Sequence, residues 1–241
     1  MKVLSIGNSF SQDAQRYLHE LAKNDGVDLY CANLFIGGCS LETHYDNLLK
    51  DKANYQLEIN GQTTSEFTSI KKALLSAEWD YITLQQASHK SGDYTSYTPY
   101  IKELYSYVKS VCPFAKILLH QTWAYEDKSE KLTITPYQTA EEMHSAIVNA
   151  YNQCLRDADF DGIIPCGEAM INAIRLGVEK MHRDTFHASL GKGRYLLALT
   201  WYKYITGNDI SCNNFNSLDE SITEKERELI INAVTTACKI S

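Results

Sequence analysis

Short runs of apolar residues alternate along this chain with longer segments whose apolar residues recur at helical spacing. Such alternation is typical of α/β proteins, in which helices cross over between neighbouring parallel strands. Five runs have the length and character of buried strands, and they cover residues 2–6, 28–36, 80–86, 115–120 and 162–165. We therefore expect a three-layer αβα sandwich built on a five-stranded parallel sheet.

Two threonine–proline pairs mark points where helices are expected to begin. Thr98-Pro99 and Thr135-Pro136 each place a capping residue before a proline, which suits the first position of a helix. Further along, Thr223 and Glu226 have the spacing of a capping box. These signals predict that helices follow residues 98–99, 135–136 and 223.

Two polar segments do not fit this scheme of strands and helices. Residues 40–64 have few periodic apolar positions, and residues 88–99 are polar and rich in tyrosine. Long connections in compact domains are often functional loops, and ligands of open α/β sheets bind where the strands end. We expect both segments to be loops near a binding site.

Length and charge limit the class of protein further. The 241 residues contain no repeat and no Pro/Gly-rich linker, which indicates a single domain over residues 1–241. The net charge of −7, without a basic run, disfavours nucleic acid or an anionic membrane as a partner. No apolar stretch approaches the length of a membrane span.

The cysteine pattern argues against cross-links and structural metal. The seven cysteines are an odd number and form no C-x-x-C pair, so neither a disulfide framework nor a zinc site is expected. His44, His144 and His182 are scattered, and they predict no metal triad. Because the first apolar run is also too short for a signal peptide, we expect a cytoplasmic location.

The first predicted strand ends in Gly7-Asn8-Ser9-Phe10-Ser11 and leads into a helix. A serine at a helix N-terminus lies near free backbone N–H groups, which stabilise negative charge. Ser9 at this point suits a catalytic nucleophile, a phosphate-binding turn or an ordinary helix cap. The phosphate alternative is the weaker one, since no lysine follows the turn as it does in a P-loop.

A second candidate motif lies far from the first, at Asp184 and His187. An aspartate three residues before a histidine can orient the imidazole, and the histidine can then deprotonate a serine. The alternative is a helix entrance with a surface aspartate and a half-buried histidine.

Together, the early G-N-S-F motif and the late D-x-x-H motif resemble the SGNH, or GDSL-like, hydrolase superfamily. The resemblance extends from Val3 to the helix after His187, and the opening residues and Leu84-Gln85-Gln86 look most like its DUF4886 branch. It implies a flavodoxin-like fold and a catalytic triad of Ser9, Asp184 and His187, without metal or organic cofactor.

The resemblance also implies an oxyanion hole, formed in part by the N–H of Ser9. A glycine after the second strand contributes an N–H in this superfamily, and here Gly38 is favoured over its neighbour Gly37. The third strand usually ends in G-x-N-D, but this chain has Gln85 and Gln86 instead. A glutamine amide is a comparable donor, and we expect Gln86 to take this role.

Aromatic residues after the fourth strand could contribute to substrate binding. Trp123 and Tyr125 could stack on a sugar ring, or they could belong to the core. His89 follows the third strand and suits a solvated loop better than a pocket wall.

The sequence thus predicts a serine esterase that removes acyl groups, acetyl above all, from small molecules such as acylated carbohydrates. The alternative is a non-catalytic glycan- or small-molecule-binding domain on the same fold, which a spoiled oxyanion hole would favour. Hydrolysis of p-nitrophenyl acetate separates the two.

Overall fold

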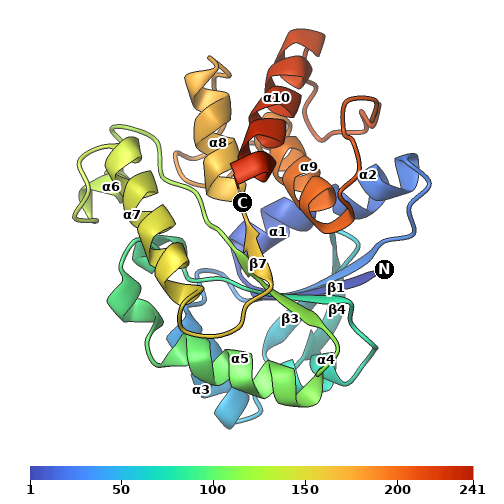
Figure 1. The fold of residues 1–241 in the computed structure, drawn as a ribbon, viewed down its shortest axis with the longest axis vertical. Coiled ribbons are helices and arrows are strands. Elements are labelled where there is room, and N and C mark those ends of the chain that lie inside the picture. Colours follow the sequence, from blue (N-terminus) through green and yellow to red (C-terminus); the bar gives the residue numbers. More distant parts are fainter. Residues whose placement is uncertain (241) are drawn as a thin grey trace.

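A computed structural model describes residues 1–240, and its centre is a seven-stranded sheet in the order β4-β3-β2-β1-β5-β6-β7 (Figure 1). The parallel strands coincide with the five predicted apolar runs: β1 (Lys2–Gly7), β2 (Tyr30–Phe35), β5 (Tyr81–Leu84), β6 (Lys116–His120) and β7 (Gly162–Ile164). The chain leaves β1 towards β2 and later returns to β1's other side as β5. That reversal is where ligands bind in open α/β sheets.

The predicted five-stranded sheet is extended by an antiparallel hairpin, β3 (Tyr55–Ile59) and β4 (Gln62–Thr68), which pairs with β2. Residues 40–64 are therefore not a long loop, since they also contain helix α3 (Leu41–Leu49). The hairpin turn is Asn60-Gly61, a dipeptide with strong hairpin preference. β4 is the edge strand and carries mostly exposed polar residues, and β3 mixes polar with apolar residues, so neither has a buried strand's apolar run.

Helices cover both faces of the sheet (Figure 1). One layer contains α1 (Ser9–Gln15), α2 (Leu18–Asn24), α8 (Cys166–Arg175), α9 (Lys192–Thr206) and α10 (Glu224–Ile240). The other contains α3, α4 (Ile70–Leu74), α5 (Tyr100–Val111) and α7 (Ala140–Cys154). Buried side chains from both layers form one hydrophobic cluster around the sheet.

Two of the three helix start signals agree with the structure. Helix α5 begins directly after Pro99, and the Thr223 hydroxyl and backbone N–H exchange hydrogen bonds with Glu226 as in a capping box. The prediction at residues 135–136 is wrong, because α7 begins at Ala140 and its cap is Thr139, whose hydroxyl accepts the Glu142 N–H. The Thr135 hydroxyl instead donates to the Leu132 carbonyl, closing the turn after α6 (Glu130–Thr133).

The predicted loop of residues 88–99 is ordered around two short 3₁₀ turns, η1 (Ser88–Lys90) and η2 (Tyr94–Tyr97). Tyr97 is fully buried and its hydroxyl donates to the Ser91 carbonyl at 2.7 Å. Internal hydrogen bonds of this kind give the loop a fixed shape beside the end of β5. Within residues 1–240, no helix is long and apolar enough to cross a membrane.

Candidate active site

Ser9 is the first residue of α1 and follows the carboxyl end of the central strand β1. Asn8 caps the helix, since its Oδ1 accepts the Phe10 N–H at 3.0 Å. The Ser11 hydroxyl accepts the Asn8 N–H at 3.1 Å, which completes a reciprocal cap. Gly7 is required here, because a Cβ on it would overlap the Ser11 side chain. The turn therefore holds Ser9 at the sheet's carboxyl edge with its hydroxyl at a helix N-terminus.

Ser9, His187 and Asp184 form a continuous hydrogen-bonded row. Ser9 Oγ lies 2.8 Å from His187 Nε2, and His187 Nδ1 lies 2.7 Å from Asp184 Oδ2. A carboxylate only accepts, so Nδ1 carries the imidazole proton and Nε2 is free to accept the serine proton. Partial burial would raise the pKa of Asp184, but hydrogen bonds from His187 outweigh it and hold that pKa below its usual value.

The loop that carries Asp184 and His187 is closed by its own hydrogen bonds. Asp184 Oδ1 accepts the His187 backbone N–H at 2.8 Å, and the backbone N–H of Arg183 donates to the His187 carbonyl at 3.0 Å. Thr185 adopts a left-handed conformation, with φ +71°, to complete the turn. The three-residue spacing thus places both oxygens of one carboxylate against the same histidine.

The backbone N–H groups of Ser9 and Gly38 are available as oxyanion donors. Neither N–H, nor that of Gly37, has a hydrogen-bond acceptor within residues 1–240. Gly38 has φ +64°, and a Cβ added to it would meet no atom within 4 Å, so this turn faces open space. Asn8 Nδ2 donates to the Cys39 carbonyl at 3.0 Å, which ties the glycine turn to the residue before Ser9.

Gln86 is fully buried, and its side-chain amide is committed to other partners. Its Oε1 accepts the backbone N–H groups of Leu41 and Ala87, at 3.0 and 2.8 Å. Its Nε2 donates to the carbonyl and hydroxyl of Ser96, at 2.9 and 3.1 Å. In this arrangement Gln86 joins the start of α3 to the loop of residues 88–99, and it does not offer a donor towards Ser9.

Its neighbour Gln85 points to the other side of the sheet and contacts the turn that carries Ser9. Gln85 Nε2 donates to Asn8 Oδ1 at 2.7 Å, and its Oε1 lies 2.7 Å from His120 Nδ1. Because Oε1 can only accept, His120 Nδ1 carries the proton. Complete burial lowers the pKa of His120 to about 3, which keeps the ring neutral.

These contacts form a chain of side chains along the carboxyl edge of the sheet. The chain runs from the Cys39 carbonyl after β2, through Asn8 after β1 and Gln85 after β5, to His120 at the end of β6. Four neighbouring strand ends are thereby joined by three hydrogen bonds. The motifs in the sequence indicated no role for Asn8 and His120, although the positions of both residues at strand ends were the available signal.

Trp123 and Tyr125 lie in the core rather than on a binding surface. The Trp123 ring stacks on Phe10, with centroids 4.0 Å apart, and its Nε1 donates to the Phe186 carbonyl at 2.8 Å. The Tyr125 hydroxyl is 2.8 Å from Ser88 Oγ. Of the two alternatives, burial holds, and both residues support the loops around His187 instead of presenting a ring face to a sugar.

Among the other histidines and the cysteines, Cys39 Sγ lies 3.5 Å from His44 Nδ1, and both residues are buried away from Ser9. His44 is fully buried against Tyr55, and burial lowers its pKa to about 3. His144 and His182 each lie 3.3 Å from one glutamate. Burial raises the pKa of the Cys39 thiol to about 12, so it is a poor nucleophile. Within residues 1–240, no three metal-ligating side chains come together.

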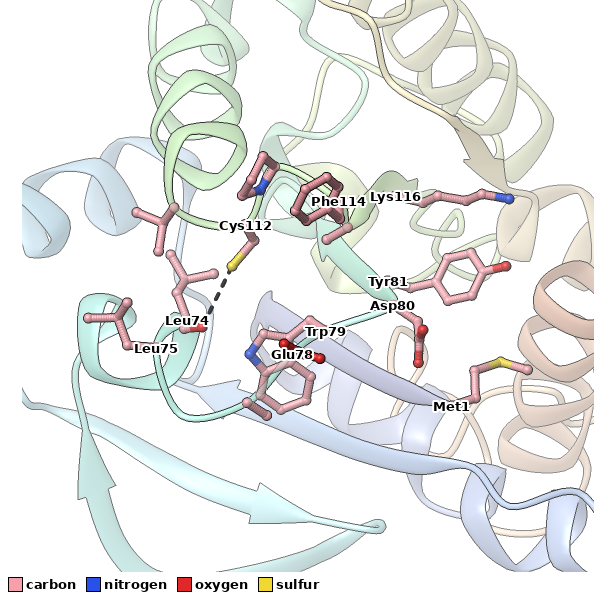
Figure 2. Close-up of a pocket in the computed structure, with 14 residues that line it drawn as sticks. Met1, Leu74, Leu75, Glu78, Trp79, Asp80, Tyr81, Cys112, Phe114 and Lys116 are labelled. Carbon is pink, nitrogen blue, oxygen red and sulfur yellow. Dashed lines mark hydrogen bonds between the residues drawn. The ribbon is translucent and has the colours of Figure 1, made fainter.

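A groove of about 890 Å³ lies at the amino ends of the parallel strands, whereas Ser9 lies at their carboxyl ends. It is lined by residues at the amino ends of β5 and β6, among them Tyr81 and Lys116. Figure 2 shows Trp79, Leu75 and Phe114 around this groove, with the Cys112 thiol directed at the Leu74 carbonyl. The groove contains none of the triad residues.

Comparisons with known proteins identify the family and the fold. Residues 2–237 match the model of the domain of unknown function DUF4886. A crystal structure of a DUF4886 family protein from Bacteroides uniformis has a TM-score of 0.92 and 36% identity, over 98% of this chain and 94% of that one. Among curated proteins, none matches.

More distant structures share the fold. A proposed SGNH hydrolase from Slackia heliotrinireducens has a TM-score of 0.62 and 21% identity, over 85% of this chain and 98% of its own. An acetyl xylan esterase has a TM-score of 0.56 and 14% identity, over 84% and 98%. At these identities the likeness concerns the architecture alone.

Proposed function

The chain belongs to the DUF4886 family and has the fold of SGNH hydrolases, and we propose that it hydrolyses acyl esters with Ser9 as the nucleophile. The observation that carries the proposal is the continuous row from Ser9 Oγ through His187 to Asp184, with links of 2.8 and 2.7 Å. A serine, a base and a carboxylate in this order are the parts that nucleophilic acyl transfer requires.

In the first half of the reaction, Ser9 Oγ attacks the ester carbonyl carbon while its proton moves to His187 Nε2. The carbonyl π electrons move to oxygen and form a tetrahedral oxyanion. Asp184 stabilises the imidazolium that results. When the oxyanion collapses, the bond to the alcohol breaks, and the leaving oxygen takes the proton from Nε2. The product is an acyl-serine.

In the second half, water attacks the acyl-serine and gives a proton to His187 Nε2. Collapse of the second tetrahedral oxyanion releases the carboxylic acid and returns that proton to Ser9 Oγ. Ser9 and His187 therefore take part in both halves of the reaction, and the cycle consumes one water for each ester.

The oxyanion in this proposal is held by the backbone N–H groups of Ser9 and Gly38. Their free donors at the carboxyl edge of the sheet support this assignment, and removal of one such donor typically costs about 2.7–4 kcal/mol of barrier. Gln86, favoured from sequence, has its amide bonded elsewhere. Gln85 supports the hole indirectly, because it fixes Asn8 and thereby the glycine turn.

For the substrate, we propose small acyl esters, with acetylated carbohydrates as the first class to test. One protein of the same fold is described as an acetyl xylan esterase. The buried Trp123 and Tyr125 contribute no argument for a sugar. The proposed reaction requires no cofactor and no nucleic-acid or membrane partner, and a cytoplasmic location remains a prediction.

The deciding experiment measures release of p-nitrophenol from p-nitrophenyl acetate by wild type and by Ser9→Ala. We expect hydrolysis by wild type and its loss in Ser9→Ala, because the nucleophile is gone. A matched control is Ser110→Ala, on the far helix α5, which should keep full activity. Labelling with a fluorophosphonate, followed by peptide mass mapping, should place the adduct on Ser9.

The alternative of a non-catalytic binding domain predicts a different result. In that case wild type would hydrolyse none of the p-nitrophenyl esters from acetate to octanoate and would form no fluorophosphonate adduct. That combined outcome would contradict the proposed function.

A further inference from the structure

A buried ion pair joins the nucleophile helix to the loop that carries the base. Asp13 lies one helical turn after Ser9 on α1, and its side chain is completely inaccessible to solvent. Both of its oxygens lie 2.9 Å from Arg183 Nη1, and Arg194 Nε donates to Oδ1 at 2.8 Å. A buried carboxylate shared by two guanidinium groups is costly to assemble and strongly restrains its partners.

Arg183 connects this carboxylate to the backbone on both sides of the imidazole. Its Nη1 also donates to the Ala188 carbonyl, and its backbone N–H donates to the His187 carbonyl at 3.0 Å. Arg183 is also the residue directly before Asp184. One side chain thus links α1 to the segment that contains the base and its carboxylate partner.

The ion pair between Asp13 and Arg183 joins the same helix and the same loop as the contact between Ser9 and His187. Ser9 and Asp13 belong to one short helix, while Asp184 and His187 belong to one short loop. Ser9 Oγ and His187 Nε2 are joined by one hydrogen bond of 2.8 Å, although the two residues are 178 positions apart in the sequence. The ion pair is therefore a second direct contact between the helix and the loop, besides the hydrogen bond between Ser9 and His187.

We propose that Asp13 and Arg183 are positioning residues that hold His187 Nε2 within hydrogen-bond distance of Ser9 Oγ. The role rests on the proposed function, because it is defined by the proton transfer between those two atoms. Neither residue touches the reacting ester. Misplacement of a catalytic group by about 1 Å costs about 10²-fold in rate. Loss of the bridge should therefore lower kcat and leave KM nearly unchanged.

The test is steady-state hydrolysis of p-nitrophenyl acetate by Arg183→Ala and Arg183→Lys. We expect kcat to fall by about 10²-fold in Arg183→Ala, and by less in Arg183→Lys, which keeps one donor and the charge. Added guanidinium chloride at millimolar concentration should restore part of the Arg183→Ala rate by occupying the space beside Asp13. At that concentration guanidinium leaves folding nearly unchanged, so a rate that is restored without a change in thermal unfolding reports the bridge and not stability.

The matched control is Arg175→Ala, which removes the ion pair between Arg175 of α8 and Glu141 of α7 and leaves Asp13 and the His187 loop untouched. It should keep the wild-type kcat. If wild type is active and Arg183→Ala keeps full kcat, the positioning role is overturned and the hydrolase proposal stands.

If wild type hydrolyses no ester, the proposed function falls, and crystal structures of wild type and Arg183→Ala then decide the geometric claim. A His187 ring that stays within hydrogen-bond distance of Ser9 Oγ in the variant would overturn it. A displaced ring would support it. Thermal unfolding of each variant identifies any that fail to fold, and in that event Arg183→Lys carries the comparison.

Discussion

Asn8 is the residue on which the turns after β1 and β2 both depend. Its Oδ1 accepts from Phe10 and Gln85, and its Nδ2 donates to the Cys39 carbonyl. An ionised aspartate at this position would have no hydrogen to give to a carbonyl. In this chain the amide is therefore needed, and the asparagine is not an interchangeable variant.

We predict that Asn8→Asp loses both activity and stability. A carboxylate oxygen would face the Cys39 carbonyl, and a buried acceptor without its donor costs about 1–3 kcal/mol. The Gly38 turn would be released, and kcat/KM for p-nitrophenyl acetate should fall by about tenfold or more. Thermal unfolding and steady-state kinetics measure the two effects. A variant with wild-type values for both would show that the Cys39 contact is dispensable.

The sequence pattern predicts that Gln86 is an oxyanion donor, whereas its contacts in the structure predict a role in stability. Its amide bonds two buried N–H groups and Ser96, so Gln86→Ala should lower the free energy of unfolding by about 1–3 kcal/mol. Urea denaturation measures this loss. If Gln86→Ala keeps its stability and yet loses activity by orders of magnitude, the residue donates to the oxyanion after all.

At the scale of elements, the β3–β4 hairpin supports the helix that carries Ser9. Gly61 in the hairpin turn has φ +74°, and a Cβ on it would overlap the backbone carbonyls of Gln15 and Arg16 at the end of α1. Glu58 of β3 is buried and accepts from Asn33 Nδ2 at 2.8 Å and from Gln12 of α1. The edge hairpin is therefore packed against α1 through backbone and side chains.

The comparison of Gly61→Ala with Gly26→Ala separates this contact from backbone strain. Both glycines have positive φ, at +74° and +70°, but Gly26 has open space where a Cβ would lie. Gly26→Ala should cost about 1–2 kcal/mol from the left-handed conformation alone. Gly61→Ala should cost more, since α1 must also move. Equal losses in urea denaturation would contradict the packing of the turn on α1.

The strands that are buried on both faces of the sheet were predicted from the sequence, and the exposed edge strand was missed. β1 and β5 are mostly apolar and buried because helices cover both their faces, and such runs are visible in a sequence. β4 is exposed along most of its length, so Asn60-Gly61 was the signal left in the sequence for this hairpin, and it was overlooked. That Ser9, Asp184 and His187 lie together could be predicted because the two motifs in combination resemble one superfamily. The direction of the Gln86 amide was not, because a loop ten residues away determines it.

For the whole molecule, two buried neutral histidines predict a loss of stability in mild acid. Burial lowers the pKa of His44 and His120 to about 3, whereas in the unfolded chain they titrate near the ordinary value of about 6.5. The stability from these groups is complete above the unfolded pKa. It is lost as pH falls from there towards the folded pKa, because the unfolded state binds protons first.

The free energy of unfolding should therefore fall below about pH 6.5, by up to about 1.4 kcal/mol per pH unit for each ring. Urea denaturation between pH 8 and pH 5 measures this slope, in a range where most carboxylates remain ionised. His44→Gln should reduce the slope, and so should His120→Asn, which keeps a donor for Gln85. Unchanged slopes in both variants would contradict the assignment.

The distance along the chain between Ser9 and His187 also affects how the protein is made. The two residues that share a hydrogen bond are 178 positions apart, and α9, which packs on the Ser9 helix, follows the second of them. A ribosome releases the amino-terminal strand and its serine long before it has added the histidine. On the proposed mechanism, a partly synthesised chain holds Ser9 without its base. Ester hydrolysis therefore cannot begin before α9 has been made.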